Sequence, residues 1–595
     1  MGFLAGWVCL DGPLDADERN RFQRAVREIT AVYPWPLRWT MRNHCVLAQA
    51  QFPRMWQGER VLSGPAQTAI AVGVQWKKYP GRRPALHHLA RDLAGGREEK
   101  ENRFDYFLCA LVQDEPRRVV LATDPVGIAP LYYHHDDRRI LFSTHQRLFH
   151  RLLDGPAGAL DPDAVLQFLL IGHALGERTF HRGVALLPPG AMLSLGPGTF
   201  KLEPAAAPFA GGKGSVPRDV REAARALLDH LEEKGRHYLT LADRPLAGLL
   251  SGGWDSRLLA ALFAGLGALS RTFTTQQQTR IAGRLVSEKK IAREVARHLG
   301  LRNRFVPPRY RTPRTRRLRL ARLDASTWFH DWAFHLADTL PVDTYLLCDG
   351  LLGDILLRGL YHSPALQACV RSQDRPAACD LLLDSFVQGF NPYTRGLAHW
   401  ERVLRPDLLR GFKRRLREEI LADLSRIPQE DFVTAFLIRN RTRRGITPLP
   451  LFIFGARGVP LLPFVDRDFL ETALGIPWAW KRDLSLFRAL LEGLSPGLSG
   501  IPSTNSRDMD ALAPYLCDSV RELSLRGRAR AWWVRSRLSA FPGFIRSGPD
   551  PGPGPLAREW VRKEILTEIL GGGGKGWRAW GFFMDRLAMV DDYFS

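Results

Sequence analysis

The sequence predicts an α/β protein built in two parts. Antiparallel β-sheets with helix layers come first, and a doubly wound parallel sheet with a largely helical extension follows. Two observations lead to this fold class. Short apolar runs bounded by turn residues fill the chain to about residue 205, as antiparallel strands do. Apolar strand patterns then alternate with amphipathic helix patterns, which is typical of a parallel sheet covered by helices.

The strands of the first part are predicted at RVVLATD (118–124), PLYYHHDDRRILFST (130–144) and GAMLSLGPGTFKLEP (190–204). A Gly/Pro-rich stretch that is almost free of large apolar residues follows, and this composition is typical of a linker. We therefore predict a first domain at 1–205, a linker at 206–219 and a second domain at 220–595.

The second part opens with a helix and a strand. Asp219 is the predicted N-cap of a helix whose apolar residues share one face: Val220, Ala223, Ala224, Leu227, Leu228 and Leu231. PLAGLL (245–250) is apolar throughout, as a strand buried in a parallel sheet is. A second strand is predicted at 270–275 and a helix at 287–301. From about residue 360 the chain is predicted to be mostly helical.

Composition narrows the function classes. The formal net charge is +22, so the surface attracts anions. No apolar run is long enough to span a bilayer, and the N-terminus lacks the basic segment of a signal peptide. The seven cysteines have no CxxC spacing, which indicates free thiols in a reducing compartment. We therefore expect a cytoplasmic protein.

Arginines gather in PPRYRTPRTRRLRLARL (307–323). Two interpretations stay open for this segment. It is either a solvated, arginine-rich loop and helix start, or a surface that attracts an acidic partner.

A glycine-rich turn joins the strand at 245–250 to a helix, in LLSGGWDSRLL (249–259). Small residues in such a turn expose backbone N–H groups toward one point, and the helix N-terminus adds positive potential there, so phosphate is the natural occupant. The stretch is not a GxxxxGK[ST] loop. Asp255 instead supplies a hard oxygen ligand for Mg²⁺ beside the phosphates.

A second acidic site is expected at a neighbouring strand end, in TYLLCDGLLGDILLRG (344–359). Asp354 is the predicted second Mg²⁺ ligand. Asp349 has two open roles, as a further acidic group of the site or as the cap of the next helix.

These segments resemble the asparagine synthetase superfamily. The DPxGxxPLYY element and the following FST, within 103–149, resemble the end of its N-terminal glutaminase-type domain, and 168–195 resembles its bridge to the synthetase half. LLSGGWDS and DGLLGD resemble its two ATP elements, and SGGWDS the pyrophosphate loop of N-type ATP pyrophosphatases. The late segment LLPFVDRDFLETALGIP (461–477) also resembles the family.

The resemblance implies an Ntn-hydrolase-like first domain of the class II glutamine amidotransferase type and an ATP-pyrophosphatase second domain. It implies ATP and Mg²⁺ as cofactors. The residues it implies for ATP binding are Leu249, Ser251, Gly252, Gly253, Asp255, Ser256, Thr272, Thr274, Glu288 and Gly350. Asp255 and Asp354 are implied as catalytic residues and as the metal ligands.

The chain departs from glutamine-dependent members at its start. Those members begin Met-Cys, whereas this chain begins Met1-Gly2-Phe3, and Cys9 comes too late to be an N-terminal nucleophile. The glutamine-gripping Asn-Gly-Glu element is not evident in AIAVGVQWKKY (69–79). We expect a first domain that keeps its fold and has lost glutaminase activity.

Two further departures bear on the product. β-Lactam synthetases carry a Tyr inside the second ATP element, where this chain has Leu351. The family's active-site lysine is expected around GIPSTNSRDMD (500–510), which offers only Thr504, Asn505, Ser506 and Arg507. Arg507 is the candidate to replace the lysine as a catalytic residue.

The resemblance is nearest to lasso-peptide cyclases. It implies an AMP-forming ligase that adenylates an Asp or Glu side chain of a precursor peptide and closes a macrolactam with the peptide's N-terminal amine. The implied partners are the precursor peptide, a leader-peptide-binding protein and a leader protease, with no nucleic acid and no membrane span.

Three alternatives stay open. One is amidation of a sugar or small acid with free ammonia or an external amine, and another is ring closure like that of β-lactam synthetases. A basic RNA-binding or tRNA-modifying protein that uses the same ATP loop is a third. The glutaminase-like first domain and the absence of paired cysteines disfavour this third reading.

Overall fold

The computed structural model describes residues 2–52, 60–75, 85–94, 104–203, 217–241, 244–277, 280–281, 284–309, 313–324, 326–327, 330–388, 396–428, 430–504, 506, 509–517, 559–562, 586–587 and 589–590. The predicted linker therefore lies outside the described residues, apart from 217–219. Within the described ranges, no helix combines the length and the apolar character that crossing a bilayer requires.

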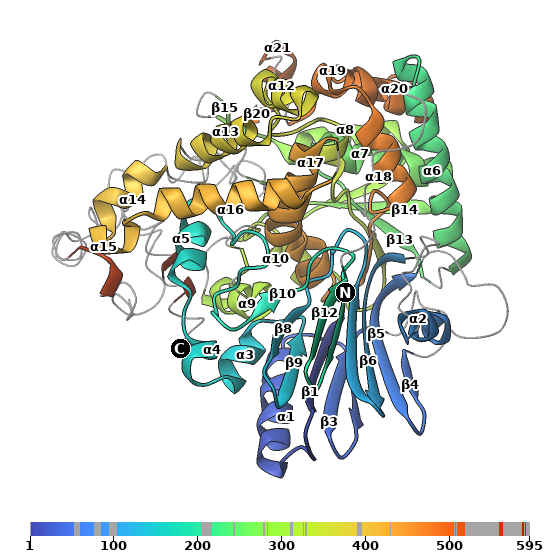
Figure 1. The fold of residues 1–595 in the computed structure, drawn as a ribbon. Helices are drawn as coiled ribbons and strands as arrows, with labels where there is room; N and C mark the ends of the chain where they lie inside the picture. The colour runs from blue at the N-terminus through green and yellow to red at the C-terminus, as the bar shows by residue number, and fades with distance from the viewer. Residues whose placement is uncertain are drawn as a thin grey trace, which may run out of the picture.

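The first part contains two six-stranded antiparallel sheets (Figure 1). One has the order β10 (Ala185–Leu186), β8 (Tyr132–His135), β9 (Arg139–Ser143), β1 (Phe3–Cys9), β3 (Cys45–Ala50) and β2 (Leu37–Met41). The other has the order β12 (Thr199–Glu203), β11 (Met192–Gly196), β7 (Arg117–Thr123), β6 (Phe104–Asp114), β5 (Gln67–Gln75) and β4 (Val61–Ser63). All three strand-rich segments predicted for this part form antiparallel strands.

Alternation along the strands separates two cores. In β5, Ile70 and Val72 join the large core between the sheets, whereas Ala69 and Ala71 face a smaller core under α2 (Ala85–Ala94). This follows from the two-residue period of a strand, which points successive side chains to opposite faces. On the other sheet, α1 (Ala16–Thr30) packs Phe22 against Trp7 of β1.

The second part is built on a five-stranded parallel sheet, confirming the doubly wound prediction. Its order is β17 (Arg302–Phe305), β14 (Leu269–Thr274), β13 (Leu246–Leu249), β18 (Leu346–Cys348) and β19 (Val459–Leu461). The chain leaves β13 toward β14 and β17, and it returns to β18 and β19 on the other side. The strand order therefore reverses between β13 and β18, and ligands of such sheets bind at the carboxyl ends beside this reversal.

Helices cover both faces of the parallel sheet. On one face lie α6 (Val220–Leu241), α7 (Trp254–Gly265), α18 (Arg467–Gly475) and α20 (Ser485–Leu494). On the other, α9 (Pro313–Leu323), α10 (Phe334–Thr339) and the π-helix η2 (Leu449–Phe454) pack on Ala247, Phe273 and Leu347. Asp219 caps α6, because its Oδ1 accepts the N–H groups of Arg221 and Glu222 at 2.8 and 2.9 Å.

The remaining elements join and extend these two layers (Figure 1). After β9 come α3 (Arg147–Leu152), α4 (Gly155–Gly158) and α5 (Pro162–Ile171), of which α3 packs against α1. The predicted helix at 287–301 is α8 (Glu288–His298), and β15 (Arg280–Ile281), β16 (Arg284–Val286) and β20 (Leu516–Cys517) form a small sheet. The helical extension comprises α11 (Gly353–Leu356), α12 (Pro364–Ser372), α13 (Arg375–Gln388), α14 (Leu397–Val403), α15 (Pro406–Leu409), α16 (Phe412–Arg426), α17 (Phe432–Leu437), the π-helix η1 (Ile438–Ile446), α19 (Trp478–Arg482), η3 (Leu498–Gly500), α21 (Met509–Leu512) and η4 (Ala513–Tyr515).

The arginine-rich segment is partly internal. Arg319 and Arg322, on α9, are buried and form ion pairs with Asp331 at 3.2 Å and Asp338 at 3.5 Å. These two arginines therefore stabilise the fold, and the solvated-loop interpretation is wrong for them. All seven cysteines are buried free thiols, as their number and spacing predict.

Candidate active site

The loop after β13 is held in shape by its own serines. Ser251 N donates to Ser256 Oγ at 3.0 Å, and Gly253 N donates to Ser251 Oγ at 3.0 Å. Gly253 has extended backbone angles and is the N-cap of α7, so Asp255 lies in the first helical turn. The amide of Gly252 donates to the buried carboxyl of Glu288, the first residue of α8. The predicted phosphate loop is thus a strand-turn-helix unit. Three residues predicted to bind ATP, namely Ser251, Ser256 and Glu288, stabilise it by accepting hydrogen bonds from its backbone.

The second acidic segment crosses directly over this loop. Asp349 and Gly350 follow β18, and α11 begins at Gly353 with Asp354 in its first turn. A Cβ on Gly350 would lie 2.9 Å from Asp255 Cβ, and one on Gly353 would lie 2.5 Å from Asp255 Oδ1. Both glycines are therefore needed for the two strand ends to meet at the reversal point of the sheet.

A cavity of about 200 Å³ opens where the two segments meet. Seven of the predicted site residues line it: Leu249, Ser251, Asp255, Ser256, Glu288, Gly350 and Asp354. Four other predicted residues are not among its lining: Gly252, Gly253, Thr272 and Thr274. The hydroxyl of Thr274 donates to Leu250 O at 2.6 Å, and Asn303 Nδ2 donates to both threonine hydroxyls. The two threonines thus hold the strand ends together rather than face the cavity.

Most of the remaining wall is apolar, and sequence reasoning missed it. It consists of Leu250, Phe273, Trp332, Leu336, Leu351, Leu352, Ile446, Leu449 and Phe454, with the polar residues Thr275, Gln277 and Asp349. These residues come from the ends of β13 and β14, from the segment between β18 and α11, from α10 and the residues before it, and from the two π-helices. Among the wall segments from α10 and the π-helices, only 449–454 stands out in the sequence, because it is a continuous apolar run. Such a run predicts burial but does not distinguish a residue of the core from one of a cavity wall.

Burial raises the pKa of three carboxyl groups at the cavity. The pKa of Asp255 rises to about 7, mainly through burial and then through the charge of Asp354. Burial also raises the pKa of Glu288 to about 7 and that of Asp349 to about 6. Asp349 does not cap the next helix, because Leu352 is the N-cap residue of α11. Three acids with raised pKa values in one cavity mark a candidate functional site.

Arg441, on η1, places a positive charge beside Asp354. Its Nη2 lies 3.3 Å from Asp354 Oδ2, and its guanidinium carbon lies 4.5 Å from the centre of the Tyr361 ring. Its Nη1 is buried and makes no hydrogen bond to any part of the chain that the structure describes. No feature of the sequence pointed to this arginine.

The donor set fits Mg²⁺ shared with phosphate. Asp255 Oδ1 is buried and has no hydrogen-bond partner in the described residues, and Asp354 is the charge that raises its pKa most. Within the described ranges, no group of three or more Asp, Glu, His or Cys side chains is arranged as a metal cluster. Mg²⁺ is usually bound through one or two carboxylates together with substrate phosphates and water, so this pair is sufficient.

The segment 500–510, where a catalytic lysine or its replacement Arg507 is expected, contacts the phosphate loop. Thr504 N donates to Gly252 O at 3.0 Å, and Arg257, on α7, donates to the carbonyls of Ile501 and Pro502. Ser506 is described, whereas Asn505 and Arg507 lie outside the described residues. The role of Arg507 therefore stays a prediction.

The start of β1 leaves no room for a cysteine in place of Gly2. A Cβ there would lie 2.6 Å from Gln51 Cβ and 2.7 Å from Ala50 O. Gln51 Oε1 accepts the amide of Gly73 at 3.1 Å, and the adjoining cavity measures only about 10 Å³. A void of this size holds at most one water. Burial raises the pKa of Cys9 to about 11, so its thiol stays protonated and is a poor nucleophile.

Comparisons with known proteins match both parts. Residues 95–204 match the family model of a glutamine amidotransferase domain, and residues 227–331 match that of asparagine synthase. Together, in this order, the matches support the asparagine synthetase superfamily and an ATP-dependent ligase activity. No curated protein matches the chain in sequence. Among solved structures, glutamine phosphoribosylpyrophosphate amidotransferase from B. subtilis, complexed with ADP and GMP, is 8% identical, with a TM-score of 0.21 over 60% of this chain and 77% of that chain.

Proposed function

We propose that this chain, whose two domain matches support the asparagine synthetase superfamily, is a macrolactam synthetase of the lasso-peptide cyclase kind. It adenylates an Asp or Glu side chain of a peptide and joins it to the peptide's N-terminal amine. One observation carries the ATP chemistry. Asp255, in the first turn of α7, meets Gly350, Gly353 and Asp354 after β18, beside a cavity at the reversal point of the sheet.

The reaction proceeds in two steps. A carboxylate oxygen of the peptide attacks the α-phosphorus of ATP, and pyrophosphate leaves. The amine nitrogen then attacks the acyl-adenylate, AMP leaves with the bonding electrons, and the amine gives up a proton. Asp255 and Asp354 would hold Mg²⁺, which neutralises phosphate charge when bound. The N-terminus of α7 orients the phosphates, and the apolar wall excludes water that would hydrolyse the acyl-adenylate.

The amine is proposed to come from the peptide because we expect the first domain not to release ammonia from glutamine. The crowding around Gly2 and the side chain of Gln51 in the adjoining space support the loss of glutamine hydrolysis. Leu351 lines the cavity. β-Lactam synthetases carry a Tyr at this position of the second ATP element, so Leu351 disfavours β-lactam closure. Ring closure within one bound peptide needs no second substrate, so positioning supplies much of the rate enhancement.

One observation favours an alternative. The cavity volume of about 200 Å³ is below the roughly 300–1,000 Å³ of common ligand sites. A small acid amidated with free ammonia or an external amine fits such a cavity more easily than a peptide does. The basic surface, at +22, favours an anionic substrate in either case.

Mass spectrometry of the product decides between these functions. The precursor peptide is incubated with its leader protease, this protein and MgATP, and we expect a core peptide that has lost one water together with AMP and pyrophosphate. The matched control carries Asp255→Ala. A linear core peptide, or the same mass loss after the terminal amine is blocked, would contradict cyclisation by this route. ATP consumption that instead depends on ammonium and a small acid would support the alternative.

A further inference from the structure

The first part of the chain, in which we expect no glutaminase activity, makes close contacts with η1, the helix that carries Arg441. We infer that the first part serves as a template for the synthetase site, and that Arg443 is a positioning residue that sets Arg441 against Asp354 through η1. This inference rests on the proposed function, because it takes the Asp354 cavity to be the place where ATP reacts.

The arrangement begins with the geometry of a π-helix. Its i→i+5 hydrogen bonds put residues four and five positions apart on one face. Arg439, Arg443 and Arg444 therefore share a face of η1, and Arg441 lies on another. π-Helical turns recur at functional sites, where they re-aim side chains that an α-helix would place differently.

One face of η1 is docked on the first part. Arg443 is buried, and its Nε donates to Gly127 O at 2.6 Å while its Nη2 donates to Leu187 O. Arg444 donates to the carbonyls of Gly176 and Arg178. These partners are backbone carbonyls, whose positions are set by the fold of the first part rather than by side-chain rotamers.

The Gly127 turn is shaped to receive Arg443. The Asp124 carboxylate accepts the amides of Val126 at 3.1 Å and Ile128 at 3.0 Å, which folds the DPVGIAP element into a tight loop. Gly127 has a φ of +63°, and a Cβ there would lie 2.8 Å from Pro189 Cα and 2.9 Å from Arg443 Nε. Burial, together with the charges of Arg439 and Arg444, lowers the pKa of Arg443 to about 9. A buried cation of this kind is retained only where its hydrogen bonds are made.

The other face of η1 is turned to the site. Arg441 pairs with Asp354 and lies over the ring of Tyr361, and Ile446, the last residue of η1, lines the cavity. The following π-helix, η2, adds Leu449 and Phe454 to the wall. One short segment thus joins carbonyls of the first part to the wall of the ATP cavity.

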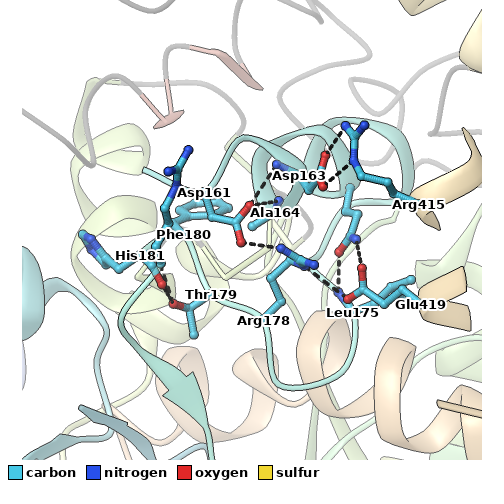
Figure 2. Close-up of polar contacts among 12 residues, drawn as sticks. Asp161, Asp163, Ala164, Leu175, Arg178, Thr179, Phe180, His181, Arg415 and Glu419 are labelled. Carbon is cyan, nitrogen blue, oxygen red and sulfur yellow. Dashed lines mark hydrogen bonds and ion pairs between the residues drawn. The ribbon is translucent and has the colours of Figure 1, made fainter. Parts of the chain in front are cut away.

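Arg178 is itself held by side-chain contacts, as Figure 2 shows. Arg178 pairs with Asp161 at 2.5 Å and with Glu419 at 3.3 Å. Arg415 also donates two hydrogen bonds of 2.8 Å to the carboxylate of Asp163. This last ion pair links α16 to α5 without touching η1, so it provides a matched control.

The test uses the full-length protein and two readouts. The first is ATP–pyrophosphate exchange with the precursor peptide, for Arg443→Met, Arg443→Lys, Gly127→Ala and the control Arg415→Met. We expect Arg443→Met and Gly127→Ala to lower kcat roughly 10-fold or more, because small misplacements of site groups cost rate steeply. Arg443→Lys should recover part of the loss, because one ammonium can still reach a carbonyl. Arg415→Met should have a kcat close to that of the unaltered protein.

A double-variant cycle separates positioning from general destabilisation. If Arg443 acts through Arg441, the double variant Arg441→Met/Arg443→Met is no slower than Arg441→Met alone. Rate losses that multiply, or full activity of Arg443→Met, would overturn the inference.

The second readout does not depend on the reaction. Hydrogen exchange of the amides of η1 should accelerate in Gly127→Ala and Arg443→Met and not in Arg415→Met. Unchanged exchange in η1 overturns the template role. An unaltered protein that shows no ATP–pyrophosphate exchange, with accelerated η1 exchange in the variants, contradicts the proposed function and leaves the docking of η1 established.

Discussion

The hydrogen that stands in place of a side chain on Gly353 lets the second acidic segment lie against the carboxyl group of Asp255. A Cβ at this position would be 2.5 Å from Asp255 Oδ1 and 2.6 Å from its Cγ. The two residues are almost 100 positions apart and stand at the carboxyl ends of neighbouring parallel strands. Their contact brings the carboxylates of Asp255 and Asp354 to one cavity.

Gly353→Ala should therefore damage the site more than the fold. The added methyl group forces Asp255 or α11 to move, and we expect the KM for MgATP to rise roughly 10-fold or more, since ligand groups tolerate little displacement. Gly265→Ala is the matched control, because a Cβ on that glycine of α7 meets nothing within 4 Å. It should leave activity unchanged and stabilise the helix slightly. Equal KM values for the two variants would show that the Gly353 contact is dispensable.

Asp255→Ala and Asp354→Ala should each abolish ATP-dependent activity while the fold persists. Each change removes a proposed Mg²⁺ ligand, and the loss should exceed roughly 100-fold in ATP–pyrophosphate exchange. The control is Asp380→Ala, which removes an exposed carboxylate that forms an ion pair with Arg417 and does not line the cavity. Thermal unfolding of all three should stay close to that of the unaltered protein. Near-normal turnover of either site variant at saturating Mg²⁺ would exclude that residue as an essential ligand.

The first domain should release no glutamate from glutamine. Gly2→Cys should not restore the reaction, because Gln51 Cβ and Ala50 O stand 2.6 and 2.7 Å from the position of the new Cβ. The assay measures glutamate with and without MgATP and the peptide. Glutamate release that tracks ATP consumption in the unaltered protein would refute the loss of this activity.

Glu288 should make the stability of the ligand-free protein depend on pH. Its pKa is raised from 4.5 to about 7 in the folded protein, so between these values the folded state holds a proton that the unfolded state has lost. Stability should fall as pH rises through this window and level off above it. Glu288→Gln keeps an acceptor for Gly252 and does not titrate.

Urea unfolding at about pH 5 and about pH 8 measures this effect. The free energy of unfolding should fall more in the unaltered protein than in Glu288→Gln, by at most roughly 3 kcal/mol. The same pH dependence in both proteins would mean that Glu288 is ionised in the fold.

Local sequence was enough to predict the elements that depend on neighbouring residues. The loop at 249–256 combines a buried strand, small turn residues and a helix start within a few positions, so its conformation and its capping are local properties. The same holds for the cap at Asp219 and for the hairpin strands of the first part. The second acidic segment was predictable because it too joins an apolar strand to glycine and aspartate.

The sequence by itself thus determined the α/β fold class, the helix start that carries Asp255 and the absence of cysteine from the second position. Only the tertiary structure decided that Arg441 pairs with Asp354, that Thr272 and Thr274 stay out of the cavity, and that Gln51 occupies the space beside Gly2. The physical reason is the sequence separation between the residues that interact. Turns and caps are set by backbone energies among adjacent residues, whereas the apolar wall and the docking of Arg443 on Gly127 arise when segments hundreds of residues apart exclude water together.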